Sequence, residues 1–151
     1  MRRYSLLLLA TIGLGACSNP AAPDDPVAEL QLNRDRWSRT GVVRYRFTIS
    51  RGCFCTPEMS GPVVVEVRDG AVVSRHYEGG SAVDPQFAGL FVTVPGLFDI
   101  IEDAIRSQAA SLSVRYDPEL GYPRSIAVDP VAGLADDEVS YRVTSFSALA
   151  D

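Results

Sequence analysis

The chain has 151 residues, of which 46% are hydrophobic and 22% are charged, a composition typical of a folded globular domain. With 14 basic against 19 acidic residues the formal net charge is −5, and the sequence has no basic cluster, so nucleic acid is not expected as a partner. The single histidine excludes the usual metal sites built from several histidines.

The first sixteen residues have the organisation of a secretory signal peptide. Arg2 and Arg3 provide its positive start, and residues 6–14 provide an apolar run of nine residues. A run of this length is far short of the roughly 20 residues that cross a bilayer. We therefore expect the chain to be exported and residues 1–16 to be removed, which takes away two arginines and changes the net charge to −7.

Residues Leu14-Gly15-Ala16-Cys17 resemble the lipobox of bacterial lipoproteins at every position. The resemblance implies cleavage before Cys17, diacylglycerol on its thiol and acylation of its new amino terminus, so that membrane lipid is a partner through Cys17. Ser18 is similar to the residue that follows the cysteine in lipoproteins sent to the outer membrane. These features predict a lipoprotein of the cell envelope, anchored in the outer membrane and facing the periplasm. A simple signal peptide with an incidental cysteine is the alternative.

A short spacer and one domain are expected after the signal peptide. Residues 17–26 include three prolines and no large apolar residue, which predicts a flexible tether. Residues 27–151 are predicted to form a single folded domain. Asp25 followed by Pro26 is typical of a helix start, and Gly41 marks the expected end of this first helix.

A strand and a hairpin are expected next. Apolar and polar residues alternate over 43–50, which predicts a half-buried strand. Residues 62–68 and 71–77 flank Asp69-Gly70, a pair typical of a two-residue hairpin turn. The register expected from that turn pairs Val67 with Val72, Val65 with Ser74 and Val63 with His76.

The second half of the chain repeats this order of elements. Residues 78–92 contain three glycines and are expected to be a loop. Apolar residues at helical spacing predict a helix over 97–105 with Thr93 as its cap, and three strands are expected at 112–116, 124–128 and 138–146.

These elements predict an α+β fold, in which two helices cover an antiparallel sheet of about six strands in the order α-β-β-β-α-β-β-β. The sequence Val-Arg-Tyr recurs at 43–45 and 114–116 in the expected first strands of the two halves. An internal duplication is therefore an open hypothesis.

Cys53-Phe54-Cys55 is the most unusual chemical feature of the domain. Two nearby thiols pair in the oxidising compartment that export implies, and a bend at Phe54 would bring them within disulfide geometry. A local structural disulfide is the favoured interpretation. A redox-active pair, a soft-metal site and two free thiols are the alternatives.

The soft-metal alternative would use Cys53 and Cys55 with Met59 and His76 as weak further candidates, and no metal is expected on balance. An acidic group lacks the spacing of a calcium loop and is expected to be a solvated turn. Its members are Asp129, Asp136, Asp137 and Glu138, with Asp117 and Glu119 nearby. No catalytic residue and no cofactor are expected, because Gly79-Gly80 lacks a phosphate-loop pattern and no Gly-x-Ser-x-Gly is present.

The domain resembles a family of small bacterial lipoproteins known only as a domain of unknown function. The elements that carry the resemblance are the lipobox, Cys53-Phe54-Cys55, the valine-rich hairpin, Tyr116-Asp117, Gly121-Tyr122-Pro123 and Asp129, and it would cover about Leu30 to Phe146. It implies an exported α+β domain with no assigned activity. The favoured function is a lipid-anchored, non-enzymatic module that binds an envelope protein or a small molecule. The alternative is thiol–disulfide or soft-metal chemistry at Cys53 and Cys55.

Overall fold

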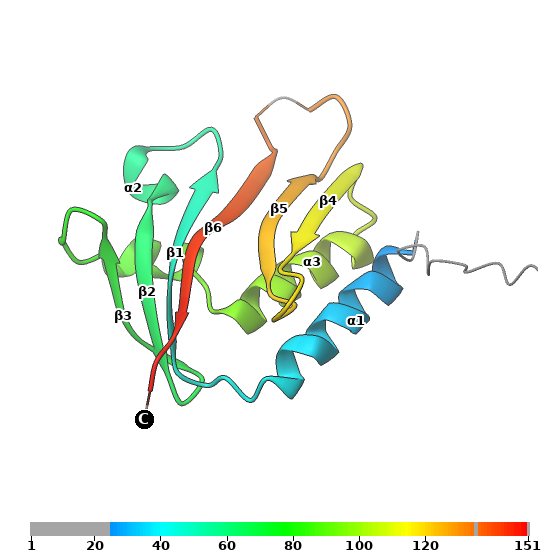
Figure 1. Ribbon diagram of the computed structural model, residues 1–151. Helices are drawn as coiled ribbons and strands as arrows, with labels where there is room; N and C mark the ends of the chain where they lie inside the picture. Colours follow the sequence, from blue (N-terminus) through cyan, green and yellow to red (C-terminus); the bar gives the residue numbers. More distant parts are fainter. Residues whose placement is uncertain (1–24, 135, 151) are drawn as a thin grey trace, which may run out of the picture.

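The computed structural model describes residues 25–134 and 136–150 (Figure 1). The expected signal peptide of residues 1–16, Cys17 and the expected tether up to residue 24 lie outside the described residues. Within the described part of the chain, no helix is long and apolar enough to cross a membrane.

The described strands form one six-stranded antiparallel sheet in the order β3-β2-β1-β6-β5-β4. They are β1 (Tyr45–Gly52), β2 (Val63–Arg68), β3 (Ala71–Tyr77), β4 (Ser111–Tyr116), β5 (Pro123–Asp129) and β6 (Val139–Ala148). β1 and β6 pair at the centre, so the early strands and the late strands meet along that pair (Figure 1).

Four helices accompany the sheet in the described residues: α1 (Pro26–Arg39), α2 (Pro57–Ser60), the 3-10 helix η1 (Pro85–Leu90) and α3 (Val94–Arg106). The predicted fold class, with two helices in the order α-β-β-β-α-β-β-β, is therefore wrong. α2 separates β1 from β2, and η1 lies in the segment expected to be a loop. Helices of four and six residues are too short to show an apolar period. Each nevertheless begins with a proline after Thr56 or Asp84, the same kind of start that identified α1.

Both long helices begin where their caps predict. The side chain of Asp25 accepts a hydrogen bond from the Val27 amide at 2.9 Å, and Thr93 Oγ1 accepts one from the Gly96 amide at 3.2 Å. α1 ends at Arg39, just before Gly41, whose φ of +64° is the left-handed value that terminates helices.

The hairpin between β2 and β3 has the expected turn but a different register. Asp69 and Gly70 have φ values of 51° and 78°, as a two-residue turn requires. Val67 pairs with Val72 as predicted, whereas Val65 pairs with Arg75 and Val63 with Tyr77. The pairing shifts between Glu66 and Val67, because a β-bulge adds one residue to β3.

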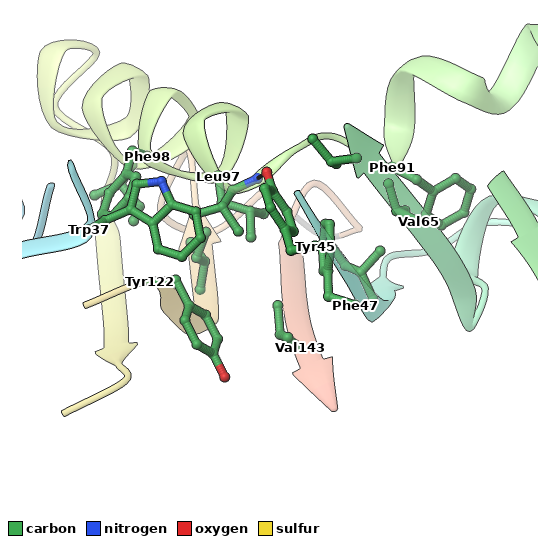
Figure 2. Close-up of a cluster of buried hydrophobic side chains, with 14 of the residues drawn as sticks. Trp37, Tyr45, Phe47, Val65, Phe91, Leu97, Phe98, Tyr122 and Val143 are labelled. Atoms are coloured by element: carbon green, nitrogen blue, oxygen red, sulfur yellow. Dashed lines mark hydrogen bonds between the residues drawn. The ribbon is translucent and has the colours of Figure 1, made fainter. Parts of the chain in front are cut away.

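The inner face of the sheet, defined by Tyr45, Phe47, Val65 and Ile126, is apolar and buried, with exposed fractions of 0–1%. Figure 2 shows side chains from this face meeting α3 and the Trp37 side chain of α1. The Trp37 ring lies edge-on to three rings of the sheet and its turns, those of Tyr45, Tyr122 and Phe146, at 5.5–6.3 Å between centroids. The core therefore lies between the sheet and the two long helices.

The outer face of the sheet carries Arg46, Glu66, Arg115, Ser125 and Arg142 and is crossed by no described helix (Figure 1). Alternation along each strand explains this polar face, since neighbouring residues point to opposite sides.

The two Val-Arg-Tyr triplets occupy different places in this fold. The first leads into β1 at the centre of the sheet, and the second ends β4 at an edge. The recurrence therefore does not mark equivalent strands, and the duplication hypothesis receives no support.

Candidate functional site

The candidate site lies where β1 ends. β1 stops at Gly52, and Cys53, Phe54 and Cys55 form a tight bend in which the Cys55 amide donates to the Cys53 carbonyl at 3.0 Å. The Cα atoms of the two cysteines are 5.3 Å apart and their sulfurs lie at disulfide-bonding distance. The Phe54 side chain is 83% exposed, so the bend presents an aromatic ring to solvent. We call residues 53–55 the cysteine loop.

Arg51 places a positive charge against the cysteine loop. Its Nη1 lies 2.8 Å from the Cys53 sulfur and 3.7 Å from the Cys55 sulfur. The guanidinium also lies over the Tyr141 ring of β6, 6.0 Å from the centroid, which holds it beside the sulfurs. Arg51 is the last residue but one of β1, and Cys53 comes two residues after it. Residues two apart along a strand lie on the same side, so the two side chains meet at the strand end.

α2 closes the other side of the cysteine loop. The Ser60 hydroxyl lies 3.4 Å from the Cys55 sulfur, and the Tyr77 hydroxyl of β3 donates to the Glu58 carbonyl at 2.8 Å. The pKa of the Glu58 carboxyl is lowered because its own backbone amide and the Thr56 hydroxyl hydrogen-bond to it. α2 is thus fixed to the sheet although it has only one turn.

A cavity of about 540 Å³ opens beside the cysteine loop. Gly52, Cys53 and Phe54 form one wall, and β4, β5 and the segment that leads into β6 form the other. This volume is within the range of small-molecule sites, about 300–1,000 Å³. The absence of a side chain at Gly52 helps to keep it open, because a Cβ there would lie 2.5 Å from the Ser140 hydroxyl.

The far wall of this cavity is acidic. Asp129, Asp136 and Glu138 line it. Within the described residues, Asp129 Oδ1 is buried and has no hydrogen-bond partner. No hydrogen bond offsets the negative charge of Asp129 at this oxygen, so the carboxylate adds to the negative potential of the wall. The cavity therefore combines negative charge with the apolar ring of Phe54.

The other predicted site residues lie apart from one another. Met59 is half-buried in α2, while His76 is exposed on β3, where it pairs with Val64 and bridges to Ala82. The described residues contain no group of three His, Cys, Asp or Glu side chains placed to hold a metal ion. Asp117 accepts hydrogen bonds from the Glu119 and Leu120 amides, so it organises a turn. Cys17 lies outside the described residues.

Sequence reasoning identified the cysteine loop but missed the cavity beside it. Asp129 and Asp136 are far from Cys53 in sequence, and only the pairing of β1 with β6 and of β6 with β5 brings them together. The contact of Arg51 with the sulfurs had a detectable signal, because a residue two positions before Cys53 on a strand shares its side.

A family model described as “Family of unknown function (DUF6174)” matches residues 29–148, which run from α1 to the end of β6. The match agrees with the expected span of an uncharacterised family. Cys17 precedes the matched residues, and the match does not identify Cys-Phe-Cys as a mark of the family. No curated protein and no solved structure matches the chain at a significant level.

Proposed function

The chain belongs to this family of unknown function, and we propose that it is an exported lipoprotein whose domain binds a basic, partly apolar ligand in the cavity beside the cysteine loop. The observation that carries the binding proposal is the cavity of about 540 Å³ between exposed Phe54 and the acidic wall of Asp129, Asp136 and Glu138.

Charge and shape select the class of ligand. Three carboxylates on one wall favour a cation, and the Phe54 ring favours an apolar group or a cation over its face. A peptide segment with an arginine or lysine next to an apolar residue has this chemistry. Such a segment is what an envelope protein partner would offer.

The binding proposal is tested with a short peptide of alternating arginine and leucine residues, titrated into the purified protein by calorimetry. Asp129→Asn removes the charge beside the unpartnered oxygen, and Phe54→Ala removes the ring. Each is expected to weaken binding about tenfold. Glu119→Gln, an exposed carboxylate of the turn after β4, is the control and should leave affinity unchanged. Equal affinity in all four proteins would contradict the proposal.

The lipid anchor is supported by Leu14-Gly15-Ala16-Cys17 and the apolar run before it. Mass spectrometry of the native protein should find a chain that starts at an acylated Cys17. Cys17→Ser should release the protein from the membrane fraction without changing the fold of the domain. An unmodified start, or a chain that keeps residues 1–16, would refute the anchor but not the binding site.

Thiol–disulfide exchange is a second candidate function, favoured by the distance of 2.8 Å between Arg51 Nη1 and the Cys53 sulfur. A neighbouring cation favours the thiolate, the form that attacks and leaves in exchange. In that reaction the Cys53–Cys55 disulfide takes two electrons and two protons from a partner dithiol, which becomes a disulfide. A thiol count with and without reductant first establishes whether the pair is bonded.

A further inference from the structure

The outer face of the sheet gathers three arginines at the β4–β5–β6 edge. Arg115 pairs with Ser125 across β4 and β5, and Ser125 pairs with Arg142 across β5 and β6. One row across three strands therefore reads arginine, serine, arginine, with adjacent strands about 4.8 Å apart. Arg124 stands next to this row, at the point where the pairing of β4 and β5 shifts by one residue.

These side chains surround a cavity of about 430 Å³, separate from the one beside the cysteine loop. No carboxylate lines it, and its polar lining residues are Arg115, Tyr116, Arg124, Ser125, Arg142 and Thr144. The three arginines are separated by 8 and 17 residues in the chain, which is why the sequence shows no basic cluster.

The arginines of this cavity are unneutralised, in contrast to those on the other half of the same face. Arg46 and Arg68 both pair with Glu66, at 2.7 and 2.8 Å, and Arg44 pairs with Asp69 at 3.2 Å. Across residues 25–134 and 136–150, none of the three cavity arginines forms an ion pair or a side-chain hydrogen bond with another residue. The Asp117 carboxylate already accepts hydrogen bonds from the Glu119 and Leu120 amides.

We propose that this cavity binds a phosphate group. Each guanidinium presents a planar fork of donors that matches two oxygens of an oxyanion, and the Ser125 hydroxyl adds a further donor. A carboxylate has only two oxygens and one charge, which a single arginine satisfies. Three arginines and the Ser125 hydroxyl fit the dianionic charge and the three or four oxygens of a phosphomonoester or of inorganic phosphate. Concentrated positive charge here opposes the net charge of −5 of the whole chain.

The phosphate could belong to a soluble molecule or to a lipid headgroup, and two arms of one experiment distinguish these sources. Inorganic phosphate is titrated into the full-length protein by calorimetry at low ionic strength. In parallel the protein is sedimented with phosphatidylcholine vesicles that contain or lack phosphatidic acid. Saturable binding of phosphate, or additional sedimentation with phosphatidic acid, supports the site. A lipid anchor would bind both kinds of vesicle equally, so only the difference between them counts.

Matched variants connect the binding to the cavity. Arg142→Gln is expected to weaken binding about tenfold. The double variant that combines Arg115→Gln with Arg142→Gln is expected to weaken binding by a further factor of about ten. Arg39→Gln, which removes one exposed arginine at the end of α1, is the control and should keep full affinity. Circular dichroism and melting temperature confirm that each variant is folded. The proposal is overturned if neither probe binds the wild-type protein, or if Arg39→Gln weakens binding as much as Arg142→Gln.

Discussion

The hydroxyl of Tyr45 is a polar atom inside the apolar core. It accepts a hydrogen bond from the Val94 amide at 3.1 Å, and this amide is one of the unpaired donors at the start of α3. Burial raises the pKa of Tyr45, and the bond from Val94 partly offsets that effect. One side chain of β1 therefore fixes where α3 begins over the sheet.

Tyr45→Phe removes this acceptor and leaves the Val94 amide buried without a partner. We expect the free energy of unfolding to fall by about 1–3 kcal/mol. Tyr141→Phe is the control, because the Tyr141 hydroxyl has no hydrogen-bond partner within the described part of the chain. Urea unfolding followed by circular dichroism measures both. A similar loss in the two variants would mean that the bond to Val94 contributes nothing.

Arg51 acts at the same scale on the cysteine loop. Its guanidinium stabilises the reduced form more than the oxidised form, because a thiolate carries charge and a disulfide does not. Arg51→Gln should therefore lower the reduction potential of the Cys53–Cys55 pair, by about 30 mV for each tenfold loss of thiolate stabilisation. Equilibration with glutathione buffers and thiol labelling measure this potential. Arg39→Gln should leave this potential unchanged. If Arg51→Gln has the same potential as the wild type, the argument for redox function is removed.

At the scale of elements, the turn between β4 and β5 connects the sheet to α1. Asp117 caps the turn, and Gly121 follows with φ of +81°. A Cβ at Gly121 would lie 2.7 Å from the Asn33 carbonyl oxygen and 2.9 Å from the Arg36 Cβ. Glycine is therefore needed at position 121 for two reasons: the backbone has a positive φ there, and α1 approaches too closely to leave room for a Cβ.

Gly121→Ala and Gly133→Ala separate these two requirements. Gly133 has φ of +79°, almost the same as Gly121, but nothing lies within 4 Å of a Cβ there. Gly133→Ala should cost about 1 kcal/mol for backbone strain alone. Gly121→Ala should cost about 2–4 kcal/mol, because α1 must also move. Thermal unfolding of both variants checks this, and equal losses would show that the contact with α1 is not tight.

The elements were predictable to different degrees for identifiable reasons. Capping residues Asp25 and Thr93 located both long helices, and Asp69-Gly70 located the hairpin turn. The register of that hairpin was not predictable, because the bulge opposite Glu66 has no glycine or other local signal. A one-residue bulge moves every later pair, which explains why His76 faces Val64 and not Val63.

At the scale of the whole molecule, buried and half-buried tyrosines determine how the fold responds to alkali. Burial raises the pKa of Tyr45, Tyr77, Tyr116 and Tyr122 above the ordinary value of 10.0. The unfolded chain therefore loses these protons at a lower pH than the folded protein. Stability is retained below about pH 10 and is lost as the pH rises from there towards the folded pKa values.

Urea titrations between about pH 9 and pH 12 should show an unfolding midpoint that falls steadily above pH 10. Tyrosinate absorbance near 295 nm should appear later in the folded protein than in urea. Tyr116→Phe, which removes the hydroxyl with the largest increase in pKa, should reduce the slope. A midpoint independent of pH over this range would contradict the assignment.

Strand order was the property that sequence patterns could not provide, and both candidate sites depend on it. The alternation of residues 43–50 predicts a strand but not its neighbours, and β1 lies beside β2 and β6. Without that order, Asp129 cannot be placed near Cys53, nor Arg115 near Arg142. Local patterns specify which residues face outward, whereas long-range pairing decides which of them share a cavity.

The central position of β6 has a consequence for biosynthesis. A chain that is threaded through an export channel amino end first delivers β1, β2 and β3 well before β6, the strand that joins them to β4 and β5. Until β6 emerges, the three strands β1–β3 and the pair β4–β5 are not joined in one sheet, and β1 keeps an open edge. Completion of the sheet thus waits for the last strand, so a chain exported as we propose would finish folding only after nearly all of it had been delivered.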